Sequence, residues 1–165
     1  VRITWELPTE LKVFKDENGE QPQVISKEFT LSLHEKATLR NFLKNWRGKD
    51  FTDDEAKAFD IEKLVGAPCM INITHKLSKD GNKTYAEIGS ISPMPKGMVC
   101  PAQINESFIW TYENFDVSRF NTLPEYLKNK MINSDEFKLA VTNGQEHESH
   151  ESKGSDIEDD LGLPF

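Results

Sequence analysis

The chain has 165 residues, of which 36% are hydrophobic, and a formal net charge of −8 at pH 7. This length accommodates one domain with a hydrophobic core and an appendage, and it excludes two full-sized domains. The hydrophobic content excludes a chain that is disordered throughout. No stretch has the pattern of a signal peptide or of a membrane span of about 20 apolar residues.

The acidic residues are concentrated at the C-terminal end of the chain. Residues 142–165 hold seven acids and the single base Lys153, whereas residues 1–141 hold 21 acids and 19 bases, which leaves the body at −2. The net charge therefore does not exclude a polyanionic partner for the body. Two cysteines, Cys69 and Cys100, do not form a disulfide framework, so we expect a reducing, cytoplasmic setting.

The N-terminal residues predict two strands joined by a turn. Apolar and polar side chains alternate over residues 1–7, which is typical of a half-buried strand, and Pro8 closes the pattern. Asn18 and Gly19 favour a hairpin turn, so a second strand is expected over residues 23–33. Because the chain opens inside the first strand, we expect a missing segment upstream of Val1.

The periodicity then changes to that of a helix. Ser32, followed three residues later by an acid, predicts an N-terminal capping box, and Gly48 predicts the helix end. Thr52 begins a second capping box for a shorter helix. We therefore predict a helical insertion over about residues 34–64. Its apolar face is formed by Leu39, Phe42, Leu43 and Trp46.

A second hairpin and a C-terminal region follow. Alternation over residues 69–77 and again over 83–92, with a turn at residues 79–82, predicts two more antiparallel strands. The remaining predicted elements are a strand over 108–112, a short helix over 124–132 and a helical stub over 134–139. From residue 142 onward the periodicity disappears, which predicts a disordered acidic tail over 142–165.

These elements predict a mainly β fold. Five or so short strands with one helical insertion favour an OB-fold-like antiparallel barrel over residues 1–141, ending in a short C-terminal helix. Periodicity alone leaves an immunoglobulin-like sandwich open.

Several side chains in the body are suited to single-stranded nucleic acid, which binds to exposed rings and basic grooves. The spacing of Trp46 favours a core role for it, and Phe51 is similarly ambiguous. Tyr85 is the better stacking candidate, because a hairpin strand can present its ring while Lys83 reaches a phosphate. The full set of DNA-binding candidates is Arg2, Lys27, Trp46, Arg47, Lys49, Phe51, Lys76, Lys83 and Tyr85.

The tail ends on apolar residues after a run of acids, in the sequence GSDIEDDLGLPF. A tail that only solubilises the chain gains nothing from a terminal phenylalanine, so the pattern favours a tethered peptide ligand. The ring would enter a partner's pocket while the acids lie along a basic rim. The partner-binding candidates are Glu158, Asp159, Asp160, Leu163, Pro164 and Phe165.

Residues 156–165 resemble the C-terminal tip of bacterial and phage single-stranded DNA-binding proteins, in which acids lead to a final Pro-Phe. The resemblance implies that the barrel binds the strand and that the tip recruits replication, recombination and repair proteins. The segment Leu161–Leu163 departs from that pattern, since the bacterial tip usually has a single apolar residue there.

Three stretches of the body resemble a family of small phage and prophage proteins associated with single-stranded DNA: ITWELP at 3–8, TLSLHEKATLRNFLKNWRGKDFT at 30–52 and LVGAPCMINITHK at 64–76. This resemblance implies sequence-independent DNA binding in phage replication or recombination, in the cytoplasm of the host cell. It also implies a further strand upstream of Val1, which would be the first strand of the barrel. It leaves open whether the chain forms a homo-oligomer.

The alternatives belong to other classes of protein. The first is a protein-protein adaptor, a replisome or virion accessory factor that binds no DNA. A metal-dependent nuclease is less favoured, because the dipole of the second helix explains Asp53 and Asp54 at its start. No enzymatic activity and no cofactor are expected. Cys69 and His75 lie on one phase of a strand but too far apart to share a metal ion, so both are expected in the core.

Overall fold

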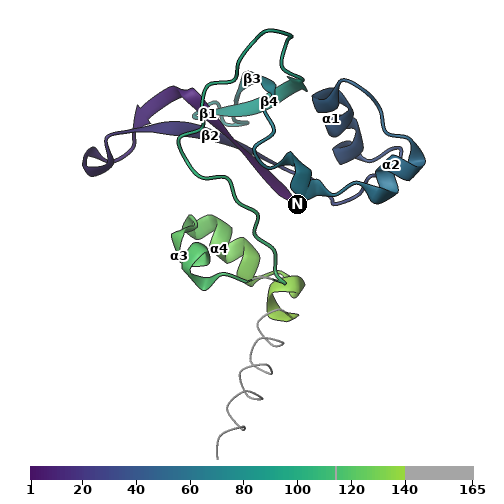
Figure 1. The fold of residues 1–165 in the computed structure, drawn as a ribbon. Helices are drawn as coiled ribbons and strands as arrows, with labels where there is room; N and C mark the ends of the chain where they lie inside the picture. Colours follow the sequence, from purple (N-terminus) through teal and green to yellow (C-terminus); the bar gives the residue numbers. More distant parts are fainter. Residues whose placement is uncertain (114, 140–165) are drawn as a thin grey trace, which may run out of the picture. The chain divides into compact units, whose positions relative to one another are not determined.

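The computed structural model describes residues 1–113 and 115–139 of the chain, which divides into two compact units, Val1–Phe108 and Ile109–Phe165 (Figure 1). The boundary between them lies inside the range expected to form one domain. The predicted tail, residues 142–165, lies outside the described residues.

The first unit begins with a long hairpin of β1 (Arg2–Val13) and β2 (Glu20–Glu28), in which Trp5 lies opposite Ile25. The prediction that the first strand ends at Pro8 is wrong. The register shifts between Leu7 and Leu11, and this irregularity accommodates a residue that lacks an N–H. The second strand was expected to continue to residue 33, but it ends at Glu28 and leads into the helical insertion.

Two helices form the predicted insertion, α1 (Thr38–Arg47) and α2 (Asp53–Ala58), followed by a 3-10 turn at Ile61–Leu64. Gly48 ends α1 with a φ of 71°, and Thr52 begins α2 with a full capping box, both as predicted. The capping box predicted at Ser32 is wrong, because α1 begins only at Thr38. The Ser32 hydroxyl instead accepts a hydrogen bond from the backbone N–H of His34 at 3.3 Å.

The second predicted hairpin is confirmed as β3 (Met70–Leu77) and β4 (Thr84–Ser92). Its register shifts between Asn72 and Ile73. At Gly89, beside this irregularity, an added Cβ would lie 2.9 Å from the Cγ2 atom of Thr74. The close approach of the two strands therefore requires glycine at this position.

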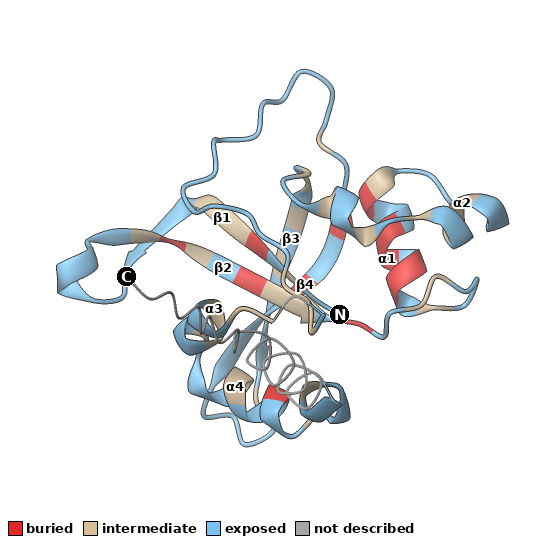
Figure 2. Ribbon diagram, turned by 60° about the horizontal axis from the view of Figure 1, so that its bottom comes forward, coloured by how far each residue is buried: buried red, intermediate tan, exposed pale blue. Residues whose placement is uncertain are grey.

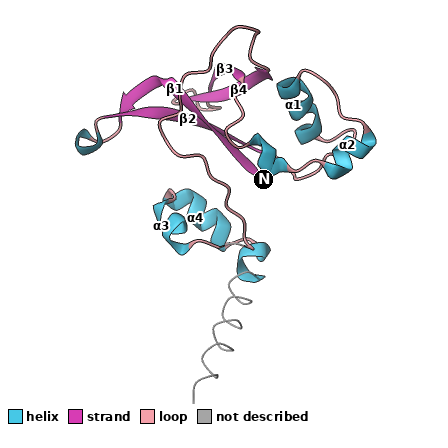
Figure 3. Cartoon of the chain, viewed as in Figure 1, coloured by secondary structure: helices cyan, strands magenta, loops and turns pink. Residues whose placement is uncertain are grey.

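The described residues form two separate two-stranded sheets and no closed barrel (Figure 3). The antiparallel pairing and the helical insertion are as predicted, but the barrel is not formed and the fold is mixed rather than mainly β. The strand expected over residues 108–112 is also wrong, since none of these residues is in a strand. The side chains of Trp110 and Tyr112 pack instead against other rings of the second unit.

One hydrophobic core joins both hairpins to α1 (Figure 2). The ring centroid of Trp5 lies 5.6 Å from that of Phe42 and 5.7 Å from that of Trp46. The core therefore fixes β1 and β4 against the same face of α1. Its buried members are Trp5, Ile25, Phe29, Leu39, Phe42, Leu43, Trp46, Phe51, Ile88 and Ile91.

The second unit is a small helical module. It contains α3 (Val117–Thr122), α4 (Glu125–Ile132) and a helical segment at 135–139. The short helix over 124–132 and the stub were predicted, whereas α3 was not. Its core is aromatic and is formed by Trp110, Tyr112, Phe115, Phe120 and Phe137.

Candidate nucleic-acid interface

Two of the predicted stacking residues are core residues. Trp46 is 6% exposed and Phe51 is 4% exposed. The indole N–H of Trp46 donates a hydrogen bond to the carbonyl of Pro68 at 3.2 Å. Phe51 is covered by the guanidinium of Arg47, 3.9 Å from its ring centroid. The core role favoured for Trp46 is confirmed, and neither ring offers a face to a base.

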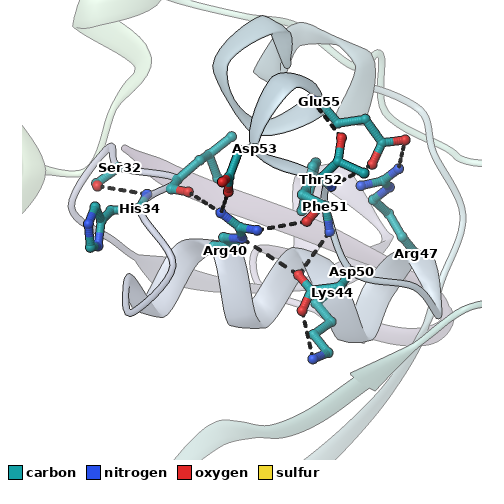
Figure 4. A network of polar contacts seen from close by, with 11 residues as sticks. Ser32, His34, Arg40, Lys44, Arg47, Asp50, Phe51, Thr52, Asp53 and Glu55 are labelled. Carbon is teal, nitrogen blue, oxygen red and sulfur yellow. Dashed lines mark hydrogen bonds and ion pairs between the residues drawn. The ribbon is translucent and has the colours of Figure 1, made fainter.

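A buried arginine holds the turn after α1 in place (Figure 4). The guanidinium of Arg40 donates hydrogen bonds to the carbonyls of Phe51 at 2.7 Å and Leu33 at 3.3 Å. It also forms ion pairs with Asp50 and Asp53 at 3.6 and 3.5 Å. The sequence alone did not single out this residue, although its place directly after Leu39 on α1 puts it beside the buried face.

Arg47 and Lys49 are paired with an acid of α2. Their side chains lie 3.6 and 3.4 Å from the carboxylate of Glu55. The pKa of Glu55 is lowered, first by the hydrogen bond from the backbone N–H of Thr52 and then by Lys49. A phosphate at this position would have to compete with Glu55 for both cations.

The two candidates on the first hairpin are also held by neighbours. Arg2 forms an ion pair with Glu28 at 3.1 Å. The ammonium group of Lys27 lies 5.3 Å from the ring centroid of Phe42 and 5.9 Å from that of Phe29. These cation-π contacts tie Lys27 to the rim of the core.

The outer part of the second hairpin, residues 74–87, presents the remaining candidates. We call it the β3–β4 arm. Lys76 lies directly opposite Tyr85 in the strand register, and Tyr85 is 53% exposed. Lys76 forms an ion pair with Glu87, whereas Lys83 has no ion-pair partner among the described residues. The arm therefore places an exposed ring between two lysines.

The turn of the β3–β4 arm is ordered by Asp80. Its carboxylate accepts hydrogen bonds from the Ser78 hydroxyl and from the backbone and side chain of Asn82, the latter two at 3.3 Å. These bonds, that of Ser78 first, lower the pKa of Asp80. Gly81 has a φ of 71°, which the turn requires. The turn between Lys76 and Lys83 is thus held by hydrogen bonds within residues 78–82.

The charge of the first unit is unevenly distributed along the chain. Residues 1–62 hold 13 acids and ten bases, whereas residues 63–108 hold five lysines and three acids, Asp80, Glu87 and Glu106. The β3–β4 arm holds Lys76, Lys79 and Lys83, and it lies in the part of the first unit where lysines outnumber acids, which suits a polyanion.

The metal site set aside from the sequence gains no support. Within residues 1–113 and 115–139, no three His, Cys, Asp or Glu side chains are grouped as metal ligands. His75 is exposed, so the expectation of a core histidine is wrong. Cys69 is half-buried, and burial, followed by the neighbouring Cys100, raises the pKa of its thiol to about 11.

None of the helices in the part described is long and apolar enough to cross a membrane.

The six partner-binding candidates at the C-terminal tip lie outside the described residues. Comparison with known protein families, curated proteins and solved structures finds no match for this chain. The resemblance to phage and bacterial single-stranded DNA-binding proteins therefore stays a prediction that depends on the quoted stretches.

Proposed function

We propose that this protein binds single-stranded DNA without sequence preference and that the β3–β4 arm is its main contact. The observation that supports this proposal is the exposed ring of Tyr85 opposite Lys76, beside Lys83, in the segment of the first unit where lysines outnumber acids. Bases of every kind can stack on such a ring, and lysines neutralise the phosphates on either side. In this proposal the two hairpins are walls of an open, OB-like module rather than of a closed barrel.

The second part of the proposal concerns the tail and is supported by the sequence alone. The acids at 158–160 and the apolar end at 163–165 would recruit replication or recombination enzymes, in a phage or prophage setting. The protein would coat strands and concentrate partners on them without catalysing a reaction itself.

Replacing Tyr85 with alanine is expected to weaken binding of oligo-dT by about 5- to 150-fold, which corresponds to the ~1–3 kcal/mol of one stacked base. Tyr85→Phe should retain most of the affinity, because stacking needs the ring and not the hydroxyl. The affinities are measured by fluorescence anisotropy with a labelled oligonucleotide.

Phe14→Ala provides the matched control, because Phe14 is also an exposed ring but lies at the end of the other hairpin. Its affinity should equal that of the wild type. If the two alanine variants lose the same affinity for oligo-dT, or if neither loses any, the β3–β4 arm is not the DNA contact.

A second candidate function is a protein-protein adaptor, and one feature favours it. The loop between β4 and the second unit carries exposed apolar side chains, among them Val99 at 86% exposure and Ile104 at 55%. The carboxylate of Glu6 fixes this loop by accepting hydrogen bonds from the backbone N–H groups of Ile104 and Asn105 at 2.6 and 2.9 Å. Absence of salt-dependent binding to oligo-dT in the folded protein would favour this candidate.

A further inference from the structure

A shallow groove lies where the end of α1 meets β4. It has a volume of about 410 Å³. Gly48 ends α1 at this groove and packs closely against Pro93, since an added Cβ would lie 3.2 Å from the Cγ atom of Pro93. The groove is lined by Lys44, Asn45, Gly48 and Lys49 on one side and by Ser90, Ile91 and Ser92 on the other.

The groove and the β3–β4 arm share strand β4. Tyr85 lies near the start of β4, and Ser92 is its last residue. Seven residue steps at about 3.3 Å per residue place the groove roughly 23 Å from the ring of Tyr85. A single strand stacked on Tyr85 would need several nucleotides to reach it.

Two kinds of polar group line the groove, and they suit different parts of a nucleotide. The last turn of α1 ends in backbone carbonyls, which favour hydrogen-bond donors and disfavour anions. The amino and imino groups of bases are such donors. The ammonium groups of Lys44 and Lys49 suit phosphate oxygens at the rim.

Both lysines can exchange their present partners for phosphate. The ammonium group of Lys44 lies 2.8 Å from Asp50, and that of Lys49 lies 3.4 Å from Glu55. Their side chains are 48% and 67% exposed. Exposed ion pairs contribute little to stability, so breaking them costs little, whereas contacts with a polyanion release counterions.

We propose that this groove is a second contact for the same DNA strand, which runs along β4 from Tyr85 with its bases toward Gly48 and its phosphates on Lys44 and Lys49. This inference rests on the proposed function. It predicts that binding strengthens with oligonucleotide length until the strand spans both contacts.

The test compares labelled dT4, which fills the arm alone, with dT12, which reaches the groove, using the full chain. In the double variant Lys44→Gln/Lys49→Gln we expect unchanged binding of dT4 and about tenfold weaker binding of dT12. The slope of log affinity against log salt for dT12 should fall in magnitude by about 1.4, at roughly 0.7 per lost phosphate contact.

Lys36→Gln/Lys57→Gln is the matched control, since it removes the same charge from two exposed lysines outside the groove. It should bind both oligonucleotides like the wild type. If both double variants lose the same affinity at both lengths, or if neither loses any, the proposal that the groove binds DNA is wrong. The proposal that the β3–β4 arm binds DNA is not affected by that result. If the wild type binds neither length, the proposed function fails and the groove fails with it.

Discussion

Replacing Trp46 with alanine is expected to lower the free energy of unfolding by about 3–5 kcal/mol, the usual cost of truncating a large buried ring. The side chain is 6% exposed, contacts Trp5 and donates a hydrogen bond to Pro68, so the loss combines a cavity with an unpaired carbonyl. The urea midpoint followed by circular dichroism should fall by about 2 M. Under conditions in which the variant is folded, its affinity for oligo-dT should be that of the wild type.

Tyr85→Ala is the matched comparison, because it truncates an exposed ring on β4. Its free energy of unfolding should change by less than about 0.5 kcal/mol, while its affinity for DNA falls. A Trp46→Ala variant that stays as stable as the wild type but binds DNA poorly would show that the indole contacts bases, in contradiction to the burial described above.

Replacing Arg40 with methionine is expected to cost about 3 kcal/mol of stability. Methionine retains the aliphatic packing against α1 but leaves the carbonyls of Leu33 and Phe51 without their charged donor. Hydrogen bonds that involve a charged group contribute about 1.5–3 kcal/mol each, and these two lie in a buried or partly buried site. Urea unfolding measures the loss.

Lys44→Met tests whether Arg40 stabilises the fold through its ion pairs or through its hydrogen bonds to the two carbonyls. Lys44 lies on the same helix and shares Asp50 as a partner, but its side chain is half exposed. Its replacement should cost less than about 1 kcal/mol, as is usual for exposed pairs. Similar losses in the two variants would mean that Arg40 acts only as one more surface charge.

The sequence predicts best those elements whose signals are local. The apolar face of α1, its end at Gly48 and the capping box at Thr52 each depend on residues within one or two turns of one another, and all three are confirmed. The turn of the second hairpin is likewise specified by its own residues, with Asp80 bonded to Ser78 and Asn82.

The wrong predictions concern features that depend on contacts between residues far apart in the sequence. The capping box predicted at Ser32 had the correct residue types. The chain before α1 instead forms a turn around His34, and the helix begins six residues after Ser32. The second strand was expected to include Leu31, yet β2 ends at Glu28 and Leu31 is 67% exposed. The prediction of a closed barrel was wrong for the same reason, because the alternation within each strand does not specify which strands pair with one another.

The candidate site was predicted only in part. Lys76 and Tyr85 were both candidates from the sequence, and the structure adds that they lie directly opposite each other. Spacing could not reveal that Glu55 pairs with both Arg47 and Lys49, because ion-pair geometry depends on side-chain reach across the turn between α1 and α2. Lys44 was missed because a lysine on an exposed helix face carries no signal of its own.

The most direct test of DNA binding is an anisotropy titration of labelled dT12 with the full chain at several salt concentrations. We expect tight binding in dilute buffer that weakens along a straight line of log affinity against log salt, with a slope of about −2 to −3 for three or four neutralised phosphates. A folded protein that leaves dT12 unbound even at the lowest ionic strength would contradict the account.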